Sequence, residues 1–209
     1  MTTGPYSHSR DRADRSATEA IPSLEILLEG NRRFVAGKPR YRRDIDAARA
    51  AAAEQHPMAA VFTCVDSRVT AESLFDCDFG QLIVVRTAGH VPDRAATASL
   101  AFAAEELSVD LIVVLGHERC GAIGLAVETA RADDGAVRDN FVLSQLRSVA
   151  AAGIEESASD PHHATMLKQI DRTVTALRNE SSLGGCDIVG ARYDLDYGTV
   201  HLTEPMQAA

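Results

Sequence analysis

The sequence predicts an α/β fold, in which a mainly parallel β-sheet is flanked by helices and preceded by an N-terminal helical arm. Two observations support this expectation. Short, continuous apolar runs at residues 59–63, 82–85 and 111–115 are typical of strands that are covered on both faces. Helical segments separate these runs, and strands that alternate with helices favour a parallel sheet with right-handed crossovers.

The other elements follow from local signals along the chain. Helices are expected at six places: 22–37, 45–54, 95–107, a segment after Gly121, about 140–152, and about 164–179. Ser23 and Asp93 are the expected N-caps, because their side chains can accept hydrogen bonds from the first free amides of a helix. Gly37 and Pro57 are expected to end the first two helices. Two last strands, joined by a turn at 196–198, are expected at 187–195 and 198–203.

The composition limits the class of protein. With 209 residues, 45% of them hydrophobic, the chain can bury one core, so we expect a single domain over 22–209 after a flexible polar tail at 1–21. The net charge of −9 argues against a nucleic-acid partner, which needs a basic surface. No apolar run approaches the roughly 18 residues of a membrane span, and the N-terminus has no hydrophobic signal segment. A cytoplasmic protein without a membrane partner is therefore expected.

Two short motifs carry the chemistry. Residues 64–68, Cys-Val-Asp-Ser-Arg, directly follow the first predicted strand, and residues 116–121, Gly-His-Glu-Arg-Cys-Gly, directly follow the third. The carboxyl ends of parallel strands meet at one edge of a sheet, where α/β proteins bind their ligands. We therefore expect Cys64, His117 and Cys120 to lie close together.

This set of side chains suits Zn²⁺. Two thiolates and one imidazole are typical zinc ligands, and three protein ligands leave a fourth tetrahedral position open. Taken singly, each signal is weaker, because a cysteine after a strand is often a buried apolar residue and Asp66 or Ser67 alone is a typical helix cap. Their occurrence together favours one zinc ion per chain. The remaining cysteines, Cys77 and Cys186, match no motif and are expected not to bind metal.

The two motifs together resemble those of the β-class carbonic anhydrases. In that family Cys-x-Asp-Ser-Arg is followed about fifty residues later by Gly-His-x-x-Cys-Gly, as it is here. Residues 86–90 and 29–34 are similar to two further family segments, and the resemblance covers roughly 22–203. It implies zinc-dependent, reversible hydration of carbon dioxide to bicarbonate and a proton through a zinc-bound hydroxide. It also implies a homo-oligomer, either a dimer or a tetramer.

The resemblance assigns roles to further residues. Asp66 and Arg68 would form the family's catalytic pair, in which Arg68 holds Asp66 in the active form. In a closed form Asp66 would instead become the fourth metal ligand. Gln55 would bind the substrate, from the partner subunit. Apart from the resemblance, the released proton must reach buffer, and His56 and His90 are candidates for carrying it, although a histidine without that role is the more common case.

Some features depart from the family or leave alternatives open. His90 stands where the family often has Asn, and Phe102 stands where plant-type members have Tyr. The chain has no Trp, which argues against the mode of bicarbonate regulation that uses one. Two other functions fit the same residues: hydrolysis of carbonyl sulfide or carbon disulfide on the same fold, and non-catalytic zinc binding.

Overall fold

A computed structural model describes residues 21–132 and 140–203. The strands are β1 (Ala59–Cys64), β2 (Leu82–Thr87), β3 (Leu111–His117), β4 (Asp187–Tyr193) and β5 (Val200–Leu202). The helices are α1 (Pro22–Val35), α2 (Ile45–Ala50), α3 (Ala71–Leu74), α4 (Arg94–Glu106), α5 (Gly121–Arg131), α6 (Phe141–Glu156) and α7 (Pro161–Arg178). Two 3-10 turns, η1 (Ala88–His90) and η2 (Ser181–Leu183), complete the described elements. Apart from Ile21, the expected polar tail lies outside the described residues, as does the end of the expected domain.

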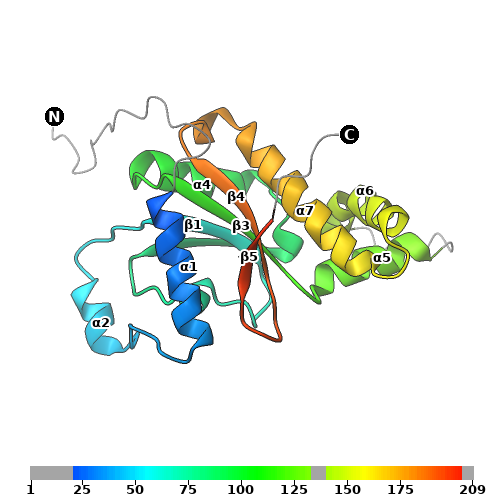
Figure 1. The fold of residues 1–209 in the computed structure, drawn as a ribbon. Coiled ribbons are helices and arrows are strands. Elements are labelled where there is room, and N and C mark those ends of the chain that lie inside the picture. Colours follow the sequence, from blue (N-terminus) through cyan, green and yellow to red (C-terminus); the bar gives the residue numbers. More distant parts are fainter. Residues whose placement is uncertain (1–20, 133–139, 204–209) are drawn as a thin grey trace.

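The sheet confirms the predicted fold class. Its strand order is β2-β1-β3-β4-β5, with parallel pairing throughout except for the antiparallel pair β4–β5. Every residue of β1 and β3 is buried, which explains why these strands are continuously apolar rather than alternating. By contrast, all residues of the edge strand β2 are only partly buried. Figure 1 shows the strands of the sheet between α1 on one side and α7 on the other.

Apolar side chains on both faces of the sheet are covered by helices. One cluster joins the sheet to α4 and α7 through residues such as Leu100 and Ile170. A second joins the opposite face to α1 and α3 through Leu27 and Leu74. A third, smaller cluster lies between α5 and α6, which pack side by side at the right of Figure 1. Within the described ranges, no helix combines the length and apolar character needed to cross a membrane.

The N-terminal helical arm is fixed to the rest of the fold by one buried carboxylate. Asp76, whose side chain is fully buried, accepts hydrogen bonds from Arg33 Nε at 2.7 Å and Arg43 Nη2 at 3.1 Å. Gly30 lets α1 approach α3 closely, since a Cβ there would lie 1.8 Å from the carbonyl oxygen of Phe75. These contacts hold α1, and the segment after it, against the sheet.

A buried asparagine joins α1 to the turn between β4 and β5. Asn31 Nδ2 donates to the carbonyl oxygen of Gly198 at 2.9 Å, and Asn31 Oδ1 accepts from the amide of Val200 at 2.9 Å. Its amide nitrogen also donates to the carbonyl of Leu74. With all of these bonds made, the burial of this polar side chain is compensated.

The structure confirms some local predictions and corrects others. Asp93 caps α4 as expected, accepting from the amide of Ala96 at 2.7 Å. Ser23 is not an N-cap, because Pro22 already occupies the first turn and Ile21 precedes the helix without a side-chain bond. The second helix ends at Ala50 rather than at 54, and the last begins three residues early. The side chain of Asp160 caps this earlier start, because it accepts a hydrogen bond from the amide of His163.

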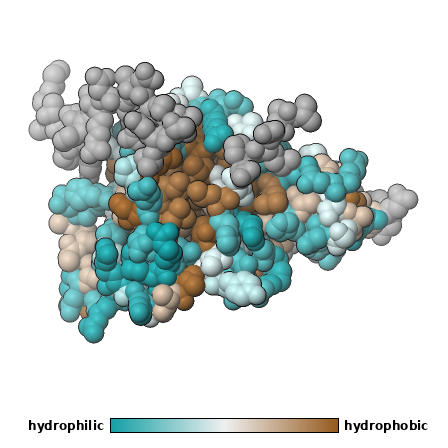
Figure 2. Space-filling model, viewed as in Figure 1, coloured by the Kyte–Doolittle hydropathy of each residue, from teal (hydrophilic) through white to brown (hydrophobic). Residues whose placement is uncertain are grey.

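The face of the molecule seen in Figure 1 carries both apolar and polar residues. Figure 2 shows apolar residues gathered in the middle of this face, between α1 and α7, with polar residues around them. Leu202 of β5, 46% exposed, and Ile26 of α1, 51% exposed, are among the large apolar side chains left in contact with solvent. An exposed apolar area of this kind is a typical contact surface for another protein chain.

Candidate metal centre

Two neighbouring strands deliver the predicted ligands to one place. Cys64 is the last residue of β1 and His117 is the last residue of β3, and these strands pair in parallel. Cys120 directly precedes α5, in the turn that follows β3. The two sulfurs and an imidazole nitrogen lie within 4.8 Å of one another, and all three residues are buried.

Small residues around the ligands make this approach fit. A Cβ on Gly116, next to His117, would lie 2.6 Å from the Ile170 side chain, so β3 meets α7 more closely here than a larger residue permits. Gly89 has a left-handed backbone with φ of 61°, and its amide donates to Cys64 Sγ at 3.3 Å. A glycine adopts this conformation at little cost, and the resulting N–H bond favours the thiolate.

The geometry of the three atoms fits a tetrahedral zinc ion. Sulfurs about 2.3 Å from a tetrahedral Zn²⁺ lie about 3.8 Å apart. The distance between Cys64 Sγ and Cys120 Sγ is 3.8 Å. His117 Nδ1 lies 2.9 Å from the carbonyl oxygen of Glu118, so this nitrogen carries the hydrogen and donates it. His117 Nε2 is then left with a free lone pair. It is buried and has no hydrogen-bond partner among the described residues, as a metal ligand requires.

The charge of the sulfur pair also favours a cation. The pKa of Cys64 is lowered to about 3, first by the hydrogen bond from Cys120 and against the effect of burial. Because Cys120 holds the shared proton, and burial opposes a second negative charge, its own pKa is raised. A divalent cation would neutralise both sulfurs and release that proton.

Asp66 and Arg68 form a bidentate ion pair beside the three candidate metal ligands. Arg68 Nε donates to Asp66 Oδ1 at 2.9 Å, and Arg68 Nη2 donates to Asp66 Oδ2 at 2.7 Å. The hydrogen bond from Arg68 is the main reason that the pKa of Asp66 lies well below its usual range. Asp66 Oδ2 is 3.9 Å from His117 Nε2, so the carboxylate faces the ligand set while Arg68 holds it.

Arg86 on β2 fixes the loop that carries this pair. Its Nε donates to the carbonyl oxygen of Cys64 at 2.9 Å, and its Nη2 donates to the carbonyl oxygen of Asp66. From the sequence, Arg86 is identified only as part of a similar segment, without a role. The structure shows that it ties the edge strand to the loop between the first ligand and the ion pair.

Gln55 does not lie at the metal centre of its own chain. Its Cα is 3.5 Å from the position of a Cβ on Gly80, just before β2 begins. Gln55 is therefore at the amino ends of β1 and β2, whereas Cys64 is at the carboxyl end of β1. A six-residue strand separates the two levels by about 16 Å, at 3.3 Å per residue.

The two histidines considered for proton transfer are placed unfavourably within one chain. His90 is buried, with neither ring nitrogen bonded within the described residues, and desolvation lowers its pKa to about 4. It is therefore neutral near pH 7 and shielded from buffer. His56 is exposed, 3.4 Å from Glu54, but lies at the same end of the sheet as Gln55.

The other two cysteines lie apart from the ligand group. Cys77 Sγ donates to the carbonyl of Phe75, and burial raises the pKa of Cys77 to about 12. Cys186 Sγ donates to the carbonyl of Val109. Among the described residues, the group that contains cysteine and could hold a metal ion is formed by Cys64 with the histidine and cysteine of the second motif.

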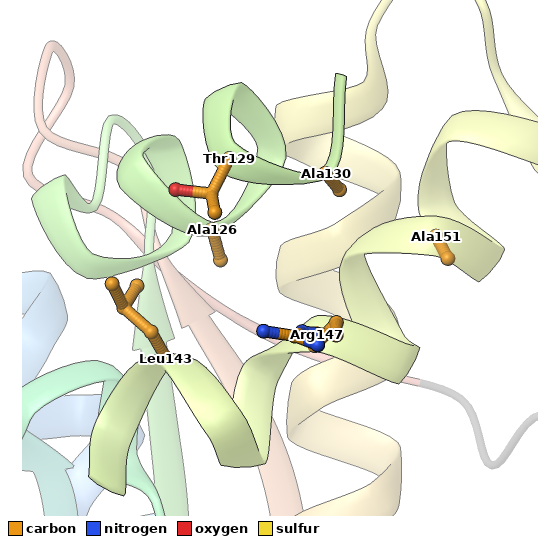
Figure 3. Close-up of a pocket in the computed structure, with 6 residues that line it drawn as sticks. All are labelled: Ala126, Thr129, Ala130, Leu143, Arg147 and Ala151. Carbon is orange, nitrogen blue, oxygen red and sulfur yellow. The ribbon is translucent and has the colours of Figure 1, made fainter. Parts of the chain in front are cut away.

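Two cavities lie near the centre and its helices. One of about 280 Å³ adjoins the candidate metal ligands and reaches the start of α7; its lining includes His117, Cys120, His162 and His163. The other, of about 260 Å³, lies between α5 and α6 and contains no typical zinc ligand. Figure 3 shows the residues that line it: Ala126, Thr129, Ala130, Leu143, Arg147 and Ala151.

Comparison with known proteins gives a consistent result. Residues 59–200 match the sequence profile of a family described as "Carbonic anhydrase". Carbonic anhydrase 2 of Mycobacterium tuberculosis is 37% identical over 198 residues, which cover 90% of this chain and 94% of that protein. A carbonic anhydrase of Mycolicibacterium smegmatis is 37% identical over 192 residues, covering 87% and 92%. The crystal structure of an Aspergillus fumigatus β-carbonic anhydrase superposes with a TM-score of 0.68 at 20% identity, covering 88% and 92%.

Proposed function

The chain belongs to the β-class carbonic anhydrases, and on this basis we propose that Cys64, His117 and Cys120 bind the catalytic Zn²⁺ of an enzyme that hydrates carbon dioxide. The reaction converts carbon dioxide reversibly to bicarbonate and a proton. The observation that carries the metal assignment is the 3.8 Å separation of two buried sulfurs beside an unpartnered imidazole nitrogen. When bound, zinc supplies a hydroxide nucleophile at neutral pH, because it lowers the pKa of water.

In this proposal Asp66 and Arg68 control access to the metal. The carboxylate of Asp66 faces the ligand set and can accept a hydrogen bond from the nucleophile, which orients its lone pair toward the substrate. Arg68 holds both carboxylate oxygens and keeps Asp66 from binding the metal itself. If this pair opened, Asp66 would be free to bind the metal in place of the nucleophile, which would give a closed form. The binding of both Asp66 oxygens by Arg68 supports an open form in this proposal.

We further propose that the enzyme is a homo-oligomer in which Gln55 serves the partner's centre. β2 forms one edge of the sheet, so a second β2 could pair with it in antiparallel orientation. That pairing would bring the amino end of one β2, where Gln55 lies, toward the carboxyl end of the other, where the metal ligands lie. The apolar surface between α1 and α7 supports a further contact, as in a tetramer (Figure 2). One structural neighbour is described as a tetrameric β-carbonic anhydrase from Sordaria macrospora.

A cytoplasmic location is proposed on chemical grounds. Two sulfurs 3.8 Å apart need little movement to form a disulfide, which would remove both from the metal. A reducing compartment protects them until zinc binds. Separating cell fractions and assaying each for the protein would test this proposal, and recovery outside the cytoplasm would contradict it.

The decisive experiment combines zinc analysis with turnover. The purified protein should contain one zinc per chain and hydrate carbon dioxide in a stopped-flow assay. Asp66→Ala should keep the zinc and lose most of the turnover. Loss of the zinc together with the turnover would instead indicate that Asp66 holds a structural metal. Sulfide release from carbonyl sulfide, measured beside carbon dioxide hydration, would show whether the narrow site prefers that substrate.

A further inference from the structure

Arg68 makes one more contact than its pairing with Asp66 requires. Its Nη2, which binds Asp66 Oδ2, also donates to the backbone carbonyl of Arg119 at 3.2 Å. Arg119 lies between the metal ligands His117 and Cys120, 51 residues along the chain from Arg68. The orientation of the guanidinium therefore depends on where the turn between two ligands places one carbonyl oxygen.

That turn has an unusual backbone, and a partner outside it holds it in place. Arg119 has φ of 50°, a left-handed conformation that is unfavourable for a residue with a long side chain. Its guanidinium donates to both carboxylate oxygens of Asp196, with Nη1–Oδ2 at 2.7 Å and Nη2–Oδ1 at 2.9 Å. Two parallel bonds fix the direction as well as the position of the side chain.

Asp196 is itself held by the turn between β4 and β5. Asp194 Oδ1 accepts the amides of Asp196 at 2.8 Å and of Tyr197 at 3.0 Å, which closes a tight turn. The same turn is bound to α1 through Asn31, as described above. Asp196 is thus a fixed acceptor, although its side chain is 62% exposed.

We propose that Arg119 and Asp196 are positioning residues for Arg68: their ion pair holds the carbonyl of Arg119 where Arg68 can bind it while keeping both oxygens of Asp66. This inference rests on the proposed function of Asp66 and Arg68. The proposed role of Arg119 and Asp196 requires no contact with the substrate, although Arg119 is one of the residues that line the cavity of about 280 Å³ beside the centre. They act through Arg68, by making the open arrangement more favourable than the one with Asp66 on the metal.

The first test is Asp196→Asn, which keeps the shape of the side chain and removes its charge. The turnover number for carbon dioxide should fall by about 3- to 10-fold with an unchanged KM. Substituting a residue that orients a metal ligand typically lowers activity by about 10- to 100-fold. We expect a smaller loss here because the ion pair between Arg119 and Asp196 is exposed. A matched control is Glu156→Gln, which breaks the ion pair between α6 and Lys168 on α7 and has no connection to Arg68. The control should leave turnover unchanged.

A second measurement does not depend on turnover. In protein loaded with cobalt(II), the visible absorption reports on the metal ligands. Asp196→Asn should shift this spectrum in the same direction as Arg68→Ala, but by less. Arg119→Asn should give the same result, because Asn tolerates a left-handed backbone and only the ion pair is lost. Adding Asp196→Asn to Arg68→Ala should change neither the turnover nor the spectrum any further.

The proposal is overturned if Asp196→Asn leaves both turnover and spectrum at wild-type values. It is also overturned if the variant loses the same factor in the Arg68→Ala background, since the effect would then not pass through Arg68. Failure of the proposed function looks different. In that case wild-type protein with stoichiometric zinc shows no carbon dioxide hydration, whereas the cobalt spectra still test the positioning of Arg68.

Discussion

Replacement of the buried carboxylate Asp76 by alanine should strongly destabilise the fold. The Asp76 side chain is 0% exposed, and those of its partners Arg33 and Arg43 are only 18% and 24% exposed. Removing one member of a buried ion pair leaves the other charges without compensation, which costs about 3–5 kcal/mol. At about 2–4 °C per kcal/mol for a chain of this size, the unfolding temperature should fall by roughly 6–20 °C.

Thermal unfolding followed by circular dichroism, at neutral pH and one protein concentration, measures this change. The matched control is Asp46→Ala, which breaks an ion pair with Arg49 whose side chains are 86% and 73% exposed. Exposed pairs contribute about 0–1 kcal/mol, so the control should lower the unfolding temperature by no more than about 4 °C. The reasoning is refuted if the two variants unfold at the same temperature.

The pH dependence gives a second check on Asp76. Burial raises its pKa, but the amide of Arg40 and the guanidinium of Arg33 outweigh burial, so the pKa is lowered in the folded protein. A group with a lowered folded pKa contributes its full stability above its unfolded pKa of about 3.9 and loses it as pH falls through the folded value. The gap between wild type and Asp76→Asn should therefore be constant from about pH 5 to 8 and shrink below about pH 4.

Three further outcomes are expected. Gly153→Ala should destabilise the protein by about 1–3 kcal/mol in thermal unfolding, because its Cβ would lie 2.1 Å from Thr165 Oγ1, whereas Gly124→Ala, with its nearest atom at 3.6 Å, should have little effect; equal losses would contradict this. Removing zinc with a chelator should lower the unfolding temperature reversibly, because metal binding is coupled to folding, and an unchanged temperature would argue against a buried zinc site. Activity should rise with pH from about 6.5 to 9 as the nucleophile forms. Arg68 holds the pKa of Asp66 well below its usual range, so the rise in activity does not come from the titration of Asp66. Activity that stays constant over this pH range would contradict the prediction.

The sequence predicts the sheet well, and it predicts that Cys64, His117 and Cys120 lie close together, because both features are encoded locally. Three continuous apolar runs correspond to β1, β2 and β3, and each of the two motifs begins at or near the carboxyl end of its strand. Once parallel pairing is assumed, the meeting of Cys64 with His117 and Cys120 follows from topology alone. The spacing His-x-x-Cys is short enough for one turn to bring both ligands to the same point.

Other features depend on approaches between distant segments, which no local pattern shows. α3 has four residues, too few for helical periodicity to be visible. From the sequence, His90 is a candidate for proton transfer, and its burial becomes evident only when α7 packs against η1. The pairing of Arg119 with Asp196, 77 residues apart, requires the turn after β4 to meet the turn after β3, so neither residue stands out in the sequence.

The position of Gln55 at the far end of β1 from Cys64 has a genetic consequence. If the Gln55 that serves each centre comes from a neighbouring subunit, two inactive variants of the protein can complement each other. In a hybrid dimer of one Gln55→Ala chain and one Asp66→Ala chain, both substitutions fall in the same centre. The other centre then has a wild-type Asp66 from one chain and a wild-type Gln55 from the other. Co-expression of the two would then restore activity that neither version has alone.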